Sequence, residues 1–384
     1  MARYIPVNFT MRASVDIPLT EAPRIAASQE LFSSLSNWEQ RWRDRQQFLQ
    51  SRGYMLHPRY RPGWVPSWKG TTEHPRHFDD HIGLFFREHL VDATTIEDEE
   101  LVYIKRVKTG DTESTIAAGF SAPPLCDDPT NHSVPILDLF QDEDDASISY
   151  MVMPFLRLVN EPPFNAVDEM LDCADQLLEG LVFLHKHGVA HRDCSYKKLM
   201  MNANALYPRG FHPVYDILLP DARTVAPYHS RSRVPVQYYY VDFGISVHIP
   251  PDVHPKLVTG AFGRDQEVPE LSENVPYNPF KLDVFIIGNF FRREFHDKFS
   301  NVDFFLPLIE SMTQQDPAAR PTACEALAQW QTIRGRVSYL HKIWRPRARE
   351  DPLVVKAAYD TYSIIRGMFY TGKNLFDRAM DIQG

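Results

Sequence analysis

The chain has 384 residues, of which 43% are hydrophobic and 12% aromatic, so it can bury a sizeable core in two domains or one large bilobal domain. The net charge of −9 argues against a general nucleic-acid or anionic-membrane binder, and no segment approaches the ~18 apolar residues of a membrane span. The four cysteines form no CxxC pair, and the N-terminus has no run of signal-peptide length. We therefore expect an intracellular protein, cytoplasmic or nuclear, with no nucleic-acid binding and no membrane span.

Residues 1–80 have the character of an N-terminal extension with one well-marked helix over 37–52. Ser36 and Glu39 form a capping-box pattern at its start, and Gly53 offers a C-terminal stop. The stretch YRPGWVPSW, rich in Pro, Arg and Trp, follows the helix. It is either a binding arm for peptide or nucleic acid or, as the acidic total favours, a strap that lies on the fold.

From residue 89 the pattern changes to short apolar runs. HLVDATTI and ELVYIKRV flank an acidic turn and predict a β-hairpin, while SVPILDLF and SISYMVMPFL add two strand-like runs. Helical periodicity begins in AVDEMLDCADQLLEGLVFLHKHG and returns around Asp283 and Thr322. This order predicts an α+β fold, with a small β-rich lobe followed by a larger helical lobe. The expected boundaries are 81–153 for the first lobe, 154–345 for the second with a turn-rich insertion at 203–237, and 346–384 for a C-terminal tail.

Two triplets indicate chemistry. The first is His191–Asp193, in GVAHRDCSYKKLMMN, which directly follows an amphipathic helical pattern. The second is Asp242–Gly244, which follows the apolar run YYYV. In this order the triplets resemble the catalytic loop and the DFG motif of the protein-kinase superfamily. The resemblance implies that Asp193 is the carboxylate that a phosphoryl-acceptor hydroxyl requires, and that Asp242 is a hard oxygen ligand for a Mg²⁺ ion that bridges ATP phosphates.

The resemblance implies a bilobal protein-kinase-like fold that uses ATP and Mg²⁺, with Asp193 and Lys105 as catalytic residues and Asp242 as the metal ligand. Lys105 in VYIKRV resembles the strand lysine that grips the α- and β-phosphates. Glu113 is its implied ion-pair partner, although the spacing of eight residues is short. The implied partner of the protein is a protein substrate or a signalling protein.

MVMPFL resembles the hinge between the lobes, with Met153 as the gatekeeper and the backbone of Pro154, Phe155 and Leu156 facing the adenine. Three structural positions are also implied: an APE-like triplet at Val268–Glu270, a helix aspartate at Asp283 that braces the catalytic loop, and Arg320 as the partner of Glu270. The phrases YRPGWVPSW, NHSVPIL, YYYVDFG and DQEVPE are similar to the large protein-kinase-like family of mushroom-forming fungi.

The chain departs from the kinase pattern at the phosphates. IGLFFREHLVDA offers only Gly83 where a glycine-rich loop is expected, with Phe85 and Glu88 in place of further glycines. Ser195 stands where many serine/threonine kinases have lysine. Lys198 stands where HRDxxxxN places the metal-binding asparagine, and an ammonium has no lone pair to offer a cation.

Two outcomes follow for Lys198. It can point at Asp193 or Asp242 and replace one metal ion, which leaves slow phosphoryl transfer, or it can tie up Asp193 and leave a pseudokinase. The first outcome predicts an ATP-dependent protein kinase of low activity that acts on Ser or Thr. The alternative is a nucleotide-binding or scaffold protein in signalling. The spacing of His185, His187, His191 and Cys194 could also imitate a metal site, an interpretation that the kinase loop makes unnecessary.

Overall fold

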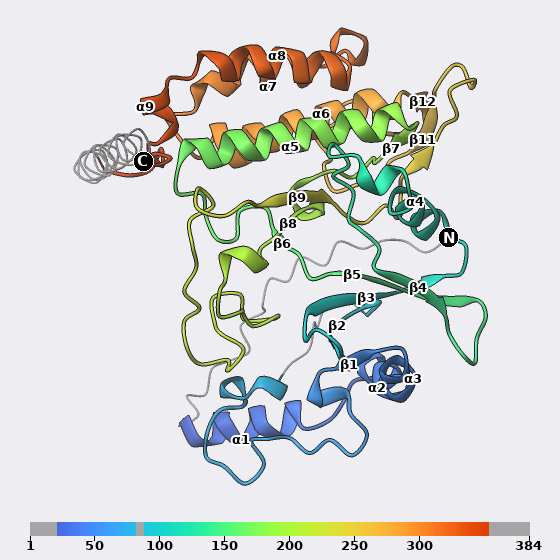
Figure 1. The fold of residues 1–384 in the computed structure, drawn as a ribbon, viewed down its shortest axis with the longest axis vertical. Helices are drawn as coiled ribbons and strands as arrows, with labels where there is room; N and C mark the ends of the chain where they lie inside the picture. The colour runs from blue at the N-terminus through green and yellow to red at the C-terminus, as the bar shows by residue number, and fades with distance from the viewer. Residues whose placement is uncertain (1–20, 82–87, 353–384) are drawn as a thin grey trace, which may run out of the picture.

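The computed structural model describes residues 21–81 and 88–352 (Figure 1). The fold is mixed α+β, with an antiparallel five-stranded sheet in the N-terminal part and a mainly helical region after it. In Figure 1 the short N-terminal helices lie below the sheet and the long helices lie above it. Within the described ranges, no helix combines the length and apolar character needed to cross a membrane.

The main sheet has the strand order β1-β2-β3-β5-β4. Its strands are β1 (Tyr54–Leu56), β2 (Leu90–Thr95), β3 (Leu101–Lys108), β4 (Asp138–Gln141) and β5 (Ile148–Pro154). The predicted hairpin is confirmed, because β2 and β3 pair with Leu90 opposite Lys105. The strand in SVPILDLF is shorter than expected: pairing starts at Asp138, after Pro135, which has no amide hydrogen to donate to a ladder.

The helix predicted over 37–52 is two helices, α2 (Asn37–Asp44) and α3 (Gln46–Ser51), which meet at Arg45. The capping box of Ser36 and Glu39 is confirmed. The single-helix prediction is wrong because Arg45 leaves the helical conformation, with φ −104° and ψ 1°. Its guanidinium bonds Asp142 and Asp144, each at 2.8 Å, beyond the end of β4. This contact ties the N-terminal helices to the sheet.

The sheet begins inside the segment assigned from sequence to the extension, because β1 pairs along β2 with Leu56 opposite Ala93. Residues 57–89 connect β1 to β2, and their described part includes the 3-10 turns η1 (Pro58–Tyr60), η2 (Pro75–His77) and η3 (Asp79–His81). In this connection Trp68 is buried, and the buried Arg59 donates to Glu39 at 2.6 Å. The strap thus packs on the fold, as the acidic composition favoured.

The helical region is built around α5 (Val167–Lys186), whose inward face is buried as its periodicity predicted. The other helices are α1 (Glu21–Phe32), α4 (Thr112–Phe120), α6 (Pro279–Phe291), α7 (Leu306–Met312), α8 (Ala323–Arg336) and α9 (Tyr339–Lys342), with a π-helical turn at Arg292–His296. Short 3-10 turns lie at Leu125–Asp127, Tyr196–Lys198, Asn204–Leu206, Asp303–Phe305 and Pro317–Ala319. The helices predicted around Asp283 and Thr322 are confirmed as α6 and α8.

The remaining described strands are short and form small sheets. They form the sheets β6-β8-β9, β7-β10 and β11-β12, with bounds β6 (Arg157–Leu158), β7 (Val189–Ala190), β8 (Leu199–Asn202), β9 (Gln237–Tyr240), β10 (Val247–His248), β11 (Val258–Gly260) and β12 (Ser272–Tyr277). The insertion 203–237 reaches from β8 to the strap, where His212 bonds Asp79 at 3.0 Å and Arg223 donates to the His77 carbonyl at 3.0 Å. The insertion is therefore anchored to the strap.

Candidate functional site

Lys105 on β3 lies at the centre of a charged cluster. Its Nζ donates to Glu113 Oε1 at 2.6 Å and to Asp242 Oδ1 at 2.8 Å. Glu113 stands in the first turn of α4, which Asp111 caps through the Ser114 amide. Burial alone would lower the pKa of Lys105, but Glu113 and Asp242 raise it, so the ammonium stays charged. The structure thus brings three predicted site residues together.

Lys198 approaches the same aspartate from the other side. Its ammonium bonds Asp242 Oδ2, and it lies 3.9 Å from Asp193 Oδ2. Burial alone would raise the pKa of Asp242, but Lys105 and Lys198 hold it well below its ordinary value. Both oxygens of the predicted metal ligand are therefore occupied by ammonium groups. Lys198 therefore contacts Asp242, as in the first of the two expected outcomes, and makes no hydrogen bond to Asp193. The contact nevertheless uses the Asp242 oxygen that a remaining Mg²⁺ ion would need.

The surroundings of Asp242 do not fit a Mg²⁺ ion. Mg²⁺ takes about six oxygen ligands, usually with one or two carboxylates. Lys198 has only donors, and Asn202, the next asparagine, uses its side-chain oxygen to accept from the Asn204 amide at 3.0 Å.

Asp193 faces the segment after the DFG-like triplet. Its Oδ1 accepts from the Arg264 amide at 2.7 Å and lies 3.5 Å from Ser195 Oγ. Gly263 precedes that amide with a φ of +133°, and a Cβ there would come within 3.2 Å of the Arg192 carbonyl. One carboxylate oxygen is thus fixed by the backbone, and the other faces Lys198.

The loop that carries Asp193 is braced from α6. Asp283 is completely buried, and its two oxygens accept the amides of His191 and Arg192 at 2.7 Å each. Arg192 and Asp242 both have positive φ, 66° and 68°, a conformation uncommon outside glycine. Backbone strain of this kind persists only where the surroundings hold it, and it is frequent at functional sites. The bracing role implied for Asp283 matches its position.

The predicted hinge is filled by aromatic side chains. Met153, Phe155 and Leu156 are all buried. Phe155 stacks on Tyr103 of β3 with ring centroids 4.2 Å apart and an interplanar angle of 23°, and Phe211 of the insertion packs against Phe155 at 5.6 Å. The Phe155 amide donates to the Leu101 carbonyl at 3.2 Å. The backbone expected to face an adenine is thus partly engaged within the protein.

The pairing implied for Arg320 is present. Two of its guanidinium nitrogens bond the two oxygens of Glu270, at 2.6 and 2.8 Å, and its side chain has 0% exposure. The same guanidinium donates to the carbonyls of Gln314 and Lys281. This bidentate pair fastens the segment before β12 to the helical region.

Some site residues carry no motif. Tyr103 shares a strand face with Lys105, two positions on, so strand alternation could have placed it beside the cluster. Nothing in the sequence of the insertion marks Phe211. Gly83 and Phe85 of the expected phosphate loop lie outside the described residues, and Glu88 is exposed.

A scan against protein-family models and a search of curated proteins found no match to this chain.

Proposed function

We propose that this chain has a bilobal protein-kinase-like fold and acts as a pseudokinase, a signalling protein that presents this fold to a protein partner without transferring phosphate. The observation that carries the proposal is the contact of Lys198 with Asp242. Phosphoryl transfer in kinases depends on Mg²⁺ held by the DFG aspartate and the catalytic-loop asparagine. In this chain Lys198 stands in place of the asparagine, and its ammonium bonds Asp242, the aspartate of the DFG-like triplet.

Charge explains why this arrangement opposes metal binding. A Mg²⁺ ion would have to displace two ammonium groups from Asp242 and then remain beside them. Like charges at such distances in a partly buried site repel strongly, and the ammonium already neutralises the carboxylate. Lys105 and Lys198 together supply the positive charge that a metal ion would bring. They cannot coordinate phosphate oxygens in the octahedral geometry of Mg²⁺, because an ammonium only donates hydrogen bonds.

The hinge supports the same proposal. An adenine ring between the lobes would need the space that Tyr103, Phe155 and Phe211 share. All three side chains are buried, and Arg157 stacks on Phe211 with its guanidinium carbon 4.8 Å from the ring centroid. Nucleotide binding would therefore require rearrangement of a packed aromatic cluster, which costs free energy.

A kinase of low activity that uses ATP and Mg²⁺ to phosphorylate Ser or Thr is the second candidate. Two observations favour it: Lys105 and Glu113 form the ion pair of active kinases, and Asp193 is 3.9 Å from Lys198, beyond hydrogen-bond distance. In that case Asp193 keeps one oxygen for the proton of an acceptor hydroxyl.

A transfer assay with γ-labelled ATP and Mg²⁺ separates the candidates, with Asp193→Asn as the matched control that removes the general base. We expect label incorporation by the wild type to equal that of Asp193→Asn. Incorporation by the wild type above the control would establish the low-activity kinase and overturn the pseudokinase proposal.

A further inference from the structure

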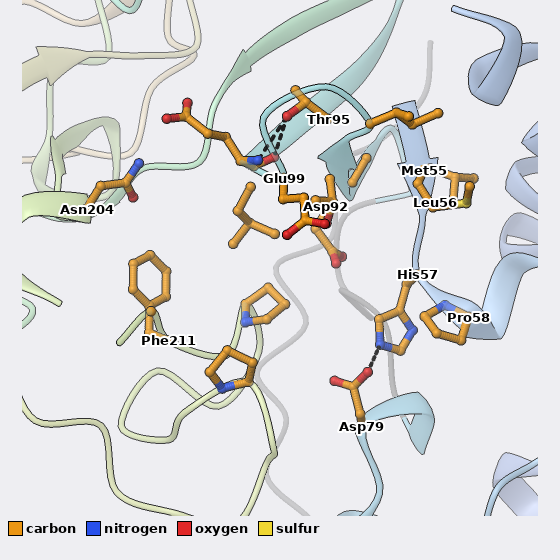
Figure 2. Close-up of a pocket in the computed structure, with 18 of the residues that line it drawn as sticks. Met55, Leu56, His57, Pro58, Asp79, Asp92, Thr95, Glu99, Asn204 and Phe211 are labelled. Carbon is orange, nitrogen blue, oxygen red and sulfur yellow. Dashed lines mark hydrogen bonds and ion pairs between the residues drawn. The ribbon is translucent and has the colours of Figure 1, made fainter. Parts of the chain in front are cut away.

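A second acidic site lies on the sheet, away from the charged cluster. It is a cavity of about 750 Å³ between the β1–β2 part of the sheet, the β2–β3 turn and the insertion (Figure 2). This volume falls within the usual range for small-molecule sites. Lys105, Asp193 and Asp242 are not among its lining residues. The cavity therefore excludes the charged cluster, although it shares Phe211 with the predicted hinge.

Asp92 is the unusual residue of this cavity. It lies on β2 opposite Tyr103, is only 4% exposed, and lines the cavity, with its carboxylate among the side chains drawn in Figure 2. Its carboxylate bonds its own backbone amide, and among the described residues no other residue forms a hydrogen bond or ion pair with it. A buried carboxylate without a partner is costly, and buried charges in proteins are normally paired.

Neighbouring charges do not supply that partner. His57 and His212 act on Asp92 through space, but each bonds Asp79, at 3.0 Å. Arg61, the arginine of the described lining, donates instead to the Leu56 carbonyl at 3.4 Å. Burial raises the pKa of Asp92 despite the two histidines. The pKa of His57 is raised against burial by its hydrogen bond to Asp79 and by the charge of Asp92, so His57 and Asp92 attract each other without a direct bond.

The rest of the lining indicates what kind of ligand would fit. Met55, Leu101 and Phe211 provide apolar surface, and the exposed Glu99 and Glu100 add negative charge at the β2–β3 turn. The described residues offer no cluster for a bare metal ion. A ligand that combines a positive charge with an apolar stem satisfies both the carboxylate and the walls.

We propose that this cavity binds a small organic amine, with its ammonium on Asp92 and its alkyl part against Met55, Leu101 and Phe211. The glutamates at the turn attract such a cation from solvent. A diamine suits the cavity best, because its second ammonium can lie near Glu99. The proposal does not depend on whether the protein transfers phosphate.

The test is isothermal titration of the full chain with 1,5-diaminopentane, and with 1,5-pentanediol as the neutral probe of matched length. We expect the diamine to bind and the diol not to bind. Asp92→Asn should weaken diamine binding by at least about tenfold, because it removes the charge and keeps the shape. Glu97→Gln is the matched control: Glu97 is an exposed acid of the same turn outside the described lining, and its loss should change affinity by less than about twofold.

A second variant keeps the test informative if Asp92→Asn does not fold. Thr94 shares the strand face of Asp92 and also lines the cavity, so Thr94→Lys would place a tethered ammonium there. It should raise the melting temperature and abolish diamine binding. The proposal is overturned if the diamine gives no binding heat, if the diol binds equally well, or if neither Asp92→Asn nor Thr94→Lys weakens binding.

Discussion

Asp242 and Asp92 are two carboxylates with opposite surroundings. Asp242 belongs to a recognisable motif, which predicts that it binds a metal ion, but each of its oxygens is bonded by a lysine ammonium. Asp92 belongs to no motif, yet it is more deeply buried, and among the described residues no other residue forms a hydrogen bond or ion pair with its carboxylate. The comparison teaches that a motif names the residue type at a position, while the neighbours decide whether its charge is available.

The largest expected effect concerns a charge buried more deeply than either carboxylate. Arg320→Ala should lower the free energy of unfolding by about 3–5 kcal/mol, because it leaves Glu270 without the bidentate partner that compensates it. Denaturant unfolding measures the change. Arg43→Ala, which removes an exposed pair with Asp44, should cost less than about 1 kcal/mol, and equal losses in the two variants would contradict a buried role for Arg320.

Asp242→Asn should have the second-largest effect on stability. It removes the shared counter-ion of Lys105 and Lys198 and should cost about 1–3 kcal/mol of stability at pH 7, less than a fully buried pair because the Asp242 side chain is 34% exposed. The pKa of Asp242 is lowered in the folded state, so this contribution is present above the ordinary value of 3.8 and is lost as the pH falls below it. Denaturant unfolding at several pH values should show the cost of the variant shrinking on acidification. A cost independent of pH would show that Asp242 is not held ionised by the lysines.

Asp92→Asn should have the smallest effect, of the opposite sign. Removing an unpaired buried charge should raise stability by up to about 1 kcal/mol at pH 7. The folded-state pKa of Asp92 is raised, so the wild type loses stability as the pH rises above 3.8, and the advantage of the variant should grow from about pH 4 to pH 7. The thermal melting temperatures of the two proteins, compared across this range, measure it. A loss as large as that of Asp242→Asn would show that Asp92 has a partner in the free protein.

Much of the architecture follows from local sequence. The β2–β3 hairpin, α5 and the capping box at Ser36 all depend on neighbouring residues, and the structure contains each of them. The break at Arg45 could not be predicted in the same way, because its cause is an ion pair with Asp142, 97 residues along the chain. Strand β1 was also missed, since three residues are too few to give a periodic signal.

The candidate site could likewise be predicted from the sequence only in part. Lys105, Glu113 and Asp242 were predicted from motif order, and the structure brings their side chains together. Their chemistry stays a prediction. The position of the Lys198 ammonium was open between two aspartates, because only tertiary structure decides the distances. The contribution of Phe211 depends on how an irregular insertion folds back, for which a single sequence holds no pattern.

The contact between Lys198 and Asp242 is the central claim, and one comparison tests it most directly. The shift in melting temperature caused by ATP is measured with and without Mg²⁺ for the wild type, for Lys198→Asn, and for Lys197→Asn as the matched control. The Lys197 ammonium lies 4.9 Å from the centroid of the Tyr196 ring, and Lys197 occupies no position of the kinase motifs, so Lys197→Asn should leave the shift unchanged. We expect Mg²⁺ to leave the wild-type and Lys197→Asn shifts unchanged and to increase the shift of Lys198→Asn, in which an amide oxygen replaces the ammonium. A wild-type shift that grows with Mg²⁺ as much as that of Lys198→Asn would contradict the account.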